Sequence, residues 1–149
     1  MPSIFLDASA LVRRYDRAEP GSATIQAICA ESNGHDLIVA RLVTVEVASA
    51  FGRKGREGTY NAKTVAGYWR VFQAHVRDQY RVIEASESIY DRAEQLVFTH
   101  PLRAADAVHI ASALEIAVAV PEALIQFWTA DRRQAEAASA EGLDVRLVR

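Results

Sequence analysis

The chain has 149 residues, half of them apolar, which is the usual size of one domain with its own buried core. Lysine and arginine total 17 against 19 aspartates and glutamates, so the formal net charge is −2. That balance excludes a general polyanion binder whose whole surface is basic. We therefore expect a single domain over residues 1–149 and only local contacts with any nucleic acid.

Cysteine usage and hydropathy limit where the protein works. Cys29 is the only cysteine, so the chain has neither an internal disulfide nor a multi-cysteine zinc site, which favours a reducing, cytoplasmic compartment. Residues 1–3 lead directly into a short apolar run, without the features of a signal peptide. The longest apolar stretch, around residues 116–120, is interrupted by Glu115 and Pro121 and is too short to cross a bilayer. We expect no membrane segment.

Short apolar runs alternate with longer segments of helical periodicity, a pattern typical of βαβ units and a parallel sheet. It predicts an α/β fold with a central parallel sheet of about five strands, near residues 3–7, 36–40, 81–84, 125–129 and 144–148. Pro20 can begin a helix that runs to about residue 32, where Asn33-Gly34 can stop it. Gly55 and Gly58 predict the turn of a helical hairpin.

Four acidic residues occupy positions where burial makes a charge costly. Asp7 follows the apolar run of residues 4–6, Glu46 lies in the first turn of a helix, Asp106 opens an otherwise apolar helix, and Asp131 comes soon after the apolar residues 125–129. Carboxylates seldom lie near apolar cores unless they are paired or coordinate a cation. Together the four predict a metal site, and Mg²⁺ or Mn²⁺ suits such hard oxygen ligands.

The predicted topology brings these acids to one edge of the sheet if the strands that Asp7 and Asp131 end are neighbours. In a parallel sheet, ligands bind outside the carboxyl ends of the strands, where the strand order reverses. Asp7 and Asp131 both end predicted strands, and Glu46 follows a third within a few residues. In the helix of Asp106, the polar residues His109, Ser112 and Glu115 recur every three positions, which indicates a narrow polar stripe on a buried helix.

Each residue also has a simpler interpretation. Asp7 and Asp131 are suited to be helix N-caps, and Glu46 to be a first-turn acid favoured by the helix dipole. His109 is either a partner or general base at the site or, more often for such a residue, a histidine hydrogen-bonded within the core. The four acids taken together favour the site.

Two basic clusters and one aromatic segment are candidates for contact with a nucleic acid. Arg53, Lys54 and Arg56 form one basic group, and Arg132 with Arg133 forms another; we favour Arg132 because it adjoins Asp131, although solvated helix ends are the commoner meaning of such clusters. Aromatic residues at helical spacing are suited to stack bases, but a core stripe or a partner surface is the commoner reading. These aromatic residues are Tyr60, Tyr68, Trp69 and Phe72.

Four segments of the chain resemble the acidic blocks of the PIN-domain family, in the family's order. They are residues 5–12 around Asp7, 44–50 around Glu46, 102–111 around Asp106 and 128–132 around Asp131. Within the family the chain most resembles the VapC-type toxins of bacterial toxin–antitoxin pairs. The resemblance implies a three-layer α/β/α fold over the whole chain.

The resemblance also implies a function. The chain is expected to be a Mg²⁺- or Mn²⁺-dependent endoribonuclease that cuts exposed single-stranded RNA, inhibits translation and growth, and is held inactive by a cognate VapB-like antitoxin, with homodimerisation also expected. Asp7, Glu46, Asp106 and Asp131 match the metal-binding acids of the family, and Ser9 and Thr129 match small hydroxyl residues beside the site.

Other classes of protein fit less well. One major class of aspartyl phosphotransferases needs a second acid two residues after the nucleophile, and here that position is Ser9. Receiver domains need a lysine at a strand end, and neither Lys54 nor Lys63 lies at one. The alternative that remains is a catalytically silent PIN-like module that binds RNA or protein.

Overall fold

The computed structural model describes residues 2–149. Its five strands form one parallel sheet in the order β3-β2-β1-β4-β5. The strands are β1 (Ser3–Leu6), β2 (Asp36–Ala40), β3 (Tyr80–Ile83), β4 (Gln126–Thr129) and β5 (Asp144–Leu147). Each lies within one residue of the bounds predicted from the sequence.

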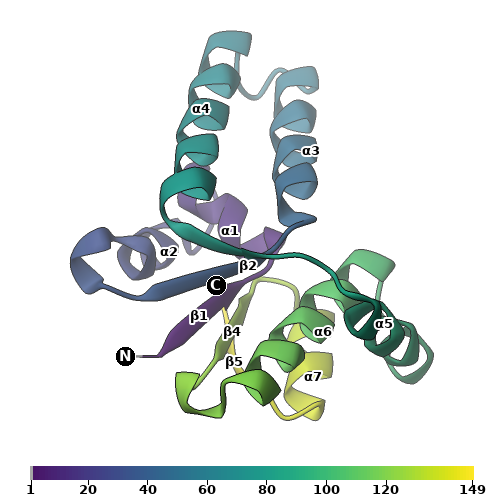
Figure 1. The fold of residues 1–149 in the computed structure, drawn as a ribbon. Coiled ribbons are helices and arrows are strands. Elements are labelled where there is room, and N and C mark those ends of the chain that lie inside the picture. Colours follow the sequence, from purple (N-terminus) through teal and green to yellow (C-terminus); the bar gives the residue numbers. More distant parts are fainter. Residues whose placement is uncertain (1) are drawn as a thin grey trace.

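Helices connect the strands and cover both faces of the sheet (Figure 1). They are α1 (Ala8–Tyr15), α2 (Ser22–Cys29), α3 (Val43–Arg56), α4 (Ala62–Asp78), α5 (Glu87–Thr99), α6 (Ala104–Ala119) and α7 (Arg132–Ala140), with short 3-10 helices at Glu31–Asn33 and Pro121–Ala123. The expected three-layer α/β/α architecture is confirmed. In the part of the chain that the structure describes, no helix has the length and hydrophobicity needed to cross a membrane.

Alternation along the strands builds two separate cores. Side chains of a strand point alternately to opposite faces of the sheet. Ile4 and Leu6 of β1 therefore pack in one cluster with residues of α1 to α4, whereas Phe5 packs in the other with residues of α5 to α7. Both faces of the sheet are thus covered, as expected for a parallel sheet.

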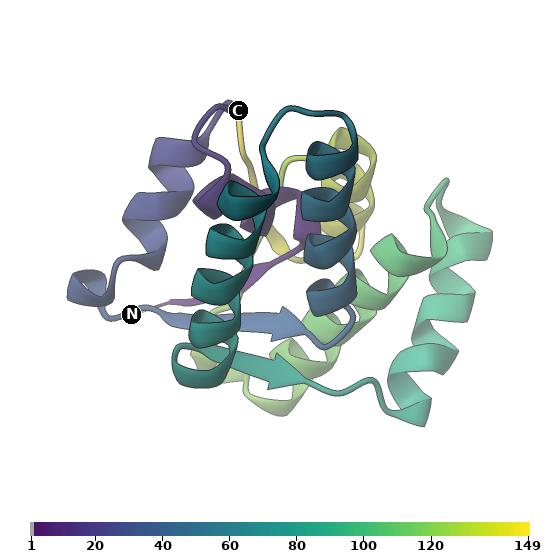
Figure 2. The same ribbon diagram turned by 90° about the horizontal axis from the view of Figure 1, so that it is seen from above.

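Helices α3 and α4 form the predicted hairpin. The two helices lie side by side and project from one face of the sheet (Figures 1 and 2). Phe72 is fully buried in the core beneath it, and Tyr68 and Trp69 pack against that core. The commoner interpretation of this aromatic segment, interior packing, therefore describes these three residues. Tyr60, in the loop between the two helices, instead lines a cavity.

Some helix boundaries differ from the expectation. Helix α2 begins at Ser22 rather than at Pro20, because Gly21 adopts a left-handed conformation with φ of 82° that separates the proline from the helix. A Cβ at Gly21 would come within 2.4 Å of a Val148 methyl group, so the close approach of the C-terminal strand also favours glycine. Gly55 lies inside α3, and the hairpin turn is made at Gly58, with φ of 76°.

The chain path places a topological switch at the centre of the sheet. From β1 the chain continues to β2 and β3 on one side, and it then crosses to β4 and β5 on the other. Strands β1 and β4 are direct neighbours, with Leu6 paired to Trp128. Their carboxyl ends therefore open the crevice in which such sheets bind ligands.

Candidate functional site

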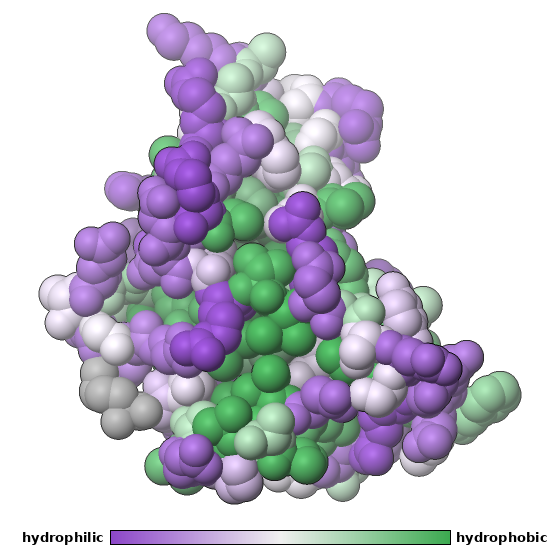
Figure 3. All heavy atoms as spheres, in the orientation of Figure 1, coloured by the Kyte–Doolittle hydropathy of each residue, from purple (hydrophilic) through white to green (hydrophobic). Residues whose placement is uncertain are grey.

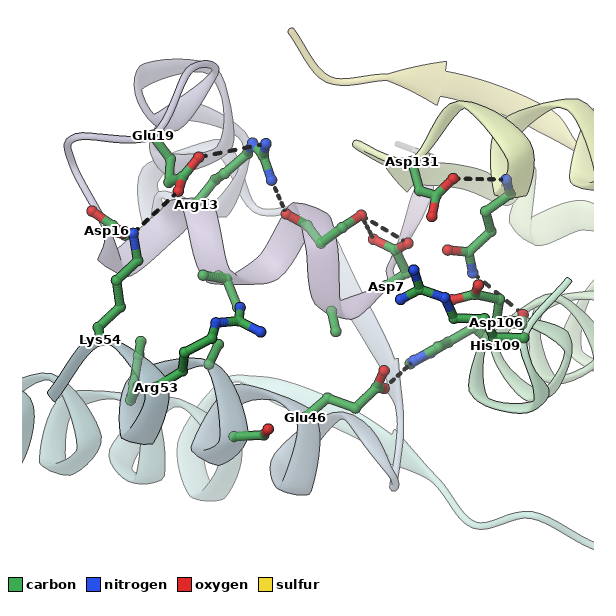
Figure 4. Close-up of a pocket in the computed structure, with 18 of the residues that line it drawn as sticks. Asp7, Arg13, Asp16, Glu19, Glu46, Arg53, Lys54, Asp106, His109 and Asp131 are labelled. Carbon is green, nitrogen blue, oxygen red and sulfur yellow. Dashed lines mark hydrogen bonds and ion pairs between the residues drawn. The ribbon is translucent and has the colours of Figure 1, made fainter. Parts of the chain in front are cut away.

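All four predicted acids line one cavity of about 470 Å³ at this carboxyl edge (Figure 4). Asp7 directly follows β1, and Asp131 lies two residues beyond β4. Glu46 and Asp106 lie in the first turns of α3 and α6. Residues that are up to 124 positions apart in the sequence (131 − 7) thus meet because β1 pairs with β4 and both helices begin at the same edge.

Asp7 lies at the bottom of the cavity and is held by hydroxyl groups. Its carboxylate accepts hydrogen bonds from Ser9 Oγ at 2.8 Å and from Thr129 Oγ1 at 2.6 Å, as well as from the backbone N–H of Ala10 at 2.9 Å. The side chain is only 1% exposed. Burial raises the pKa of Asp7 above its usual value, and the nearby His109 and these hydrogen bonds offset only part of that rise.

Ser9 and Thr129 join the two strand ends as well as holding Asp7. Their hydroxyl oxygens are 3.2 Å apart, the N–H of Ala130 donates to Ser9 Oγ, and the N–H of Asp131 donates to Thr129 Oγ1. Both residues therefore lie where the sequence predicted supporting hydroxyl groups. They fix the loop after β4 against the start of α1.

Asp106 carries the electrostatic signature of clustered carboxylates. Its pKa is raised first by burial and then by the negative charge of Asp131, with a smaller contribution from Glu46, while His109 lowers it. Because the neighbouring acids disfavour its ionised form, a cation in the cavity would relieve the repulsion.

His109 links the two helices that carry Glu46 and Asp106. Its Nε2 lies 2.5 Å from Glu46 Oε1. The histidine is 1% exposed, and its ring forms a T-shaped contact with the ring of Phe5, with 6.4 Å between the ring centroids. Within residues 2–149, Nδ1 has no hydrogen-bond partner. The histidine is therefore both buried in the core and in contact with a site acid, which combines the two interpretations offered by the sequence.

The capping interpretation of Asp7 and Asp131 is also correct. Asp7 accepts from the N–H of Ala10 at the start of α1, and Asp131 Oδ1 accepts from the N–H groups of Arg133 and Gln134 at the start of α7. Capping occupies one oxygen of each carboxylate. The second oxygen of Asp7 accepts from Thr129 and Ser9, whereas the second oxygen of Asp131 accepts no hydrogen bond within residues 2–149.

The acids share a cavity without forming a closed cage. Across residues 2–149, no three aspartate, glutamate, histidine or cysteine side chains come close enough together to surround one metal ion as they stand. Mg²⁺ is usually bound by one or two carboxylates and keeps several water ligands. An open arrangement of this kind leaves space for water and substrate oxygens.

Several residues of the cavity were not predicted as site residues. Gln134 is 1% exposed, its Nε2 donates to the backbone oxygen of Asp106, and its Oε1 lies 3.4 Å from Thr129 Oγ1. An acid at the N-cap followed three residues later by glutamine resembles a capping box, which is the signal that could have identified it. Arg103, which precedes α6, lines the same cavity.

The basic residues divide differently from the expectation. Arg132 is exposed and is not among the residues that line the cavity, so its contact with RNA stays a prediction. Arg53 and Lys54 do line it. Lys54 Nζ lies 3.6 Å from both Asp16 Oδ2 and Glu19 Oε1, so its charge is largely matched by two acids of the loop after α1.

The family of the chain follows from comparison with known proteins. The model of the PIN domain matches residues 4–140. Two relatives from Mycobacterium tuberculosis, Ribonuclease VapC45 of strain CDC 1551 / Oshkosh and Ribonuclease VapC49 of strain ATCC 25618 / H37Rv, are each 34% identical over 149 residues, covering 97% of this chain and 95% of theirs.

Solved structures share the fold at lower sequence identity. VapBC2 from Rickettsia felis, bound to a promoter DNA fragment, matches with a TM-score of 0.65 and 9% identity over 98% of both chains. VapC20 from Mycobacterium tuberculosis, described as a sarcin-ricin loop cleaving toxin, gives a TM-score of 0.61 and 16% identity over 97% of this chain and 99% of that one. With its four acids gathered at the carboxyl edge of the sheet and a family match that spans nearly all of it, the chain belongs to the PIN-domain family.

Proposed function

We propose that the protein is a metal-dependent endoribonuclease that cuts single-stranded or otherwise exposed RNA, and that it is the toxin of a toxin–antitoxin pair. The observation that carries this proposal is the meeting of Asp7, Glu46, Asp106 and Asp131 in one cavity. Relatives named as ribonucleases, at 34% identity over nearly the full length, support the reaction class.

A divalent cation fits the residues that are present. The donors are carboxylates, the hard oxygen ligands that Mg²⁺ and Mn²⁺ prefer. Burial raises the pKa of Asp7, and burial together with the charge of Asp131 raises the pKa of Asp106, so a bound cation would offset the cost of ionising both groups. Asp7, Glu46, Asp106 and Asp131 would hold the ion. Bound there, it would activate water and stabilise charge on the phosphate oxygens.

The protein's own side chains then position these ligands. Ser9 and Thr129 donate to the Asp7 carboxylate and fix its orientation. His109 does the same for Glu46, because a carboxylate oxygen can only accept, so the imidazole donates from Nε2 to Oε1. The N-termini of α1 and α7 face the same edge and favour the negative charge of an RNA phosphate.

A protein partner is supported by the neighbours and by the surface. VapBC2, whose name contains both VapB and VapC, shares the fold of this chain. The α3–α4 hairpin carries a groove of about 540 Å³ that is lined largely by apolar side chains, among them Val45, Trp69 and Val76. Apolar side chains also gather across the middle of the face seen in Figure 3. We infer that a cognate VapB-like antitoxin docks on the hairpin and that the toxin forms a homodimer. We also place the protein in the cytoplasm, because its buried free thiol, Cys29, suits a reducing compartment.

The test is cleavage of a single-stranded RNA by the purified protein with Mg²⁺, with Mn²⁺ and with chelator, beside Asp106→Asn and the control Asp91→Asn. Asp91 is an exposed acid of α5, outside the cavity. We expect cleavage that needs metal, that is lost in Asp106→Asn and that is retained in Asp91→Asn. Strong RNA binding without cleavage in Mn²⁺ would favour the alternative of a silent binding module.

A further inference from the structure

The cavity continues beyond the acids as a trough between α1 and α3, which we call the α1–α3 trough. Its α3 wall is formed by Glu46, Ser49, Ala50 and Arg53. Their spacing of i, i+3, i+4 and i+7 places them on one face of the helix. The facing wall on α1 includes Ser9, Val12 and Arg13, and Asp16 follows at the end of that helix.

The α1–α3 trough has charged residues at both ends. On its α3 wall, the residues between them are small. Ser49 and Ala50 separate Glu46 from Arg53 on α3 and occupy little space. Seven residues of α-helix rise roughly 10 Å, so the trough extends about two helical turns from the acids to Arg53. That length leaves room for the backbone of a nucleotide beyond a phosphate held at the acids.

Arg53 differs from the other cations at that end. Lys54 is paired with Asp16 and Glu19, and Arg13 lies 3.7 Å from Glu19 while also donating to backbone oxygens of Ser9 and Pro20. Among residues 2–149, Arg53 forms no ion pair or side-chain hydrogen bond. Figure 4 shows it extending from α3 toward α1, across the trough. Its guanidinium group is therefore available to a ligand.

We propose that the α1–α3 trough holds the RNA strand beside the bond to be cut and that Arg53 binds the phosphate of a flanking nucleotide. This inference rests on the proposed ribonuclease function and adds to it a substrate-binding residue. A guanidinium group binds phosphate through two parallel hydrogen bonds. Its positive charge attracts RNA locally, although the protein as a whole has a net charge of −2. Arg53 is a binding residue that sets the path of the strand, and the acids remain responsible for the chemistry.

Binding without cleavage gives the first test. Fluorescence anisotropy of a labelled single-stranded RNA of random sequence is measured on the Asp106→Asn background at increasing salt, with Arg53→Gln or Arg56→Gln added. Arg56 carries the same charge on the same helix, but it lies outside the cavity and its guanidinium group folds over Gly52. One lost phosphate contact lowers the slope of log affinity against log salt by about 0.7 for a single strand, which corresponds to roughly fivefold at 0.1 M salt.

We expect Arg53→Gln to show that loss and Arg56→Gln to bind like the parent. Equal affinity and equal slope for the two variants would overturn the proposal. The Mn²⁺-induced rise in melting temperature is measured for Arg53→Gln with the acids intact, and we expect it to match the wild type. A lost metal response would instead assign Arg53 to the fold or the metal site and would equally overturn its role in binding RNA.

Neutral linkages test the assigned ligand directly. After the cleavage position in an RNA is mapped for the wild type, substrates with one methylphosphonate on either side of that bond are compared. We expect one of them to raise KM roughly fivefold for the wild type and to have no further effect on Arg53→Gln, with kcat little changed. Additive effects of the two changes would refute the pairing. If the wild type cuts no RNA yet binds it through Arg53, the ribonuclease proposal fails and the binding site stands.

Discussion

Replacement of Asp106 by asparagine should separate the stability of the protein from its response to metal. The carboxylate of Asp106 has a raised pKa because it is partly buried and faces Asp131 and Glu46. Its folded-state pKa lies above its unfolded value, so the ionised group destabilises the folded state at neutral pH. In chelator, Asp106→Asn should therefore melt at the same temperature as the wild type or higher.

With metal the order should reverse. An ion that binds only the folded state stabilises it by about 2.7 kcal/mol at roughly one hundred times its dissociation constant. For a chain of 149 residues each kcal/mol raises Tm by about 2–4 °C, so the wild type should gain about 5–11 °C. Asp106→Asn lacks one ligand and should gain much less at the same concentration.

The assay is thermal unfolding, followed by circular dichroism, of the wild type, Asp106→Asn and the control Asp91→Asn in chelator, Mg²⁺ and Mn²⁺. Asp91→Asn removes an exposed acid of α5 outside the cavity and should respond to metal as the wild type does. An equal metal-induced rise in all three proteins would refute a shared site at Asp106. A lower melting temperature of Asp106→Asn in chelator would refute the electrostatic argument separately.

Three further predictions follow from the contacts of the site. His109→Leu removes the donor to Glu46 and should weaken Mn²⁺ binding about 10- to 100-fold in calorimetric titration. His109→Gln, whose amide can still donate, should lose less affinity for Mn²⁺. Equal Mn²⁺ affinities of the two variants would exclude a positioning role for His109. Thr129→Val keeps the shape but removes a buried hydroxyl donor to Asp7, and the free energy of unfolding in urea should fall by about 1–3 kcal/mol, against little change for the exposed Thr99→Val. In chelator, the advantage of Asp106→Asn over the wild type should shrink as pH falls through the raised folded-state pKa of Asp106, because the wild-type carboxyl group then becomes neutral; an advantage independent of pH would contradict this.

The sequence predicted the strands well because each is a short run with clear ends, and the central strands β1 and β2 are almost entirely buried. Ile4 to Leu6 are completely apolar and fully buried, and Asp7 after them caps α1 through the N–H of Ala10, one of the roles that its position suggested. The first residue of α2 was harder to predict from the sequence. A proline that can begin a helix is a local signal, whereas the close approach of Val148 to Gly21 joins residues at opposite ends of the chain.

The four acids could be predicted because burial makes each of them unusual in its own segment. Their convergence depended on the pairing of β1 with β4, which the sequence offered only as a condition. Contacts between side chains of different helices and loops could not be predicted from the local sequence pattern. The bond between His109 and Glu46 and the pairing of Lys54 with Asp16 and Glu19 depend on how α6, α3 and the loop after α1 pack against one another.

The insertion of β4 beside β1 also determines when the protein can first act. Synthesis delivers the N-terminal segments first, and Asp7 and Glu46 are present long before Asp131. Until β4 pairs with β1, neither Thr129 nor Asp131 has a place beside Asp7, so the growing chain contains no assembled site. A nuclease built in this order stays harmless to the RNA from which it is being translated until nearly all of its chain has been made.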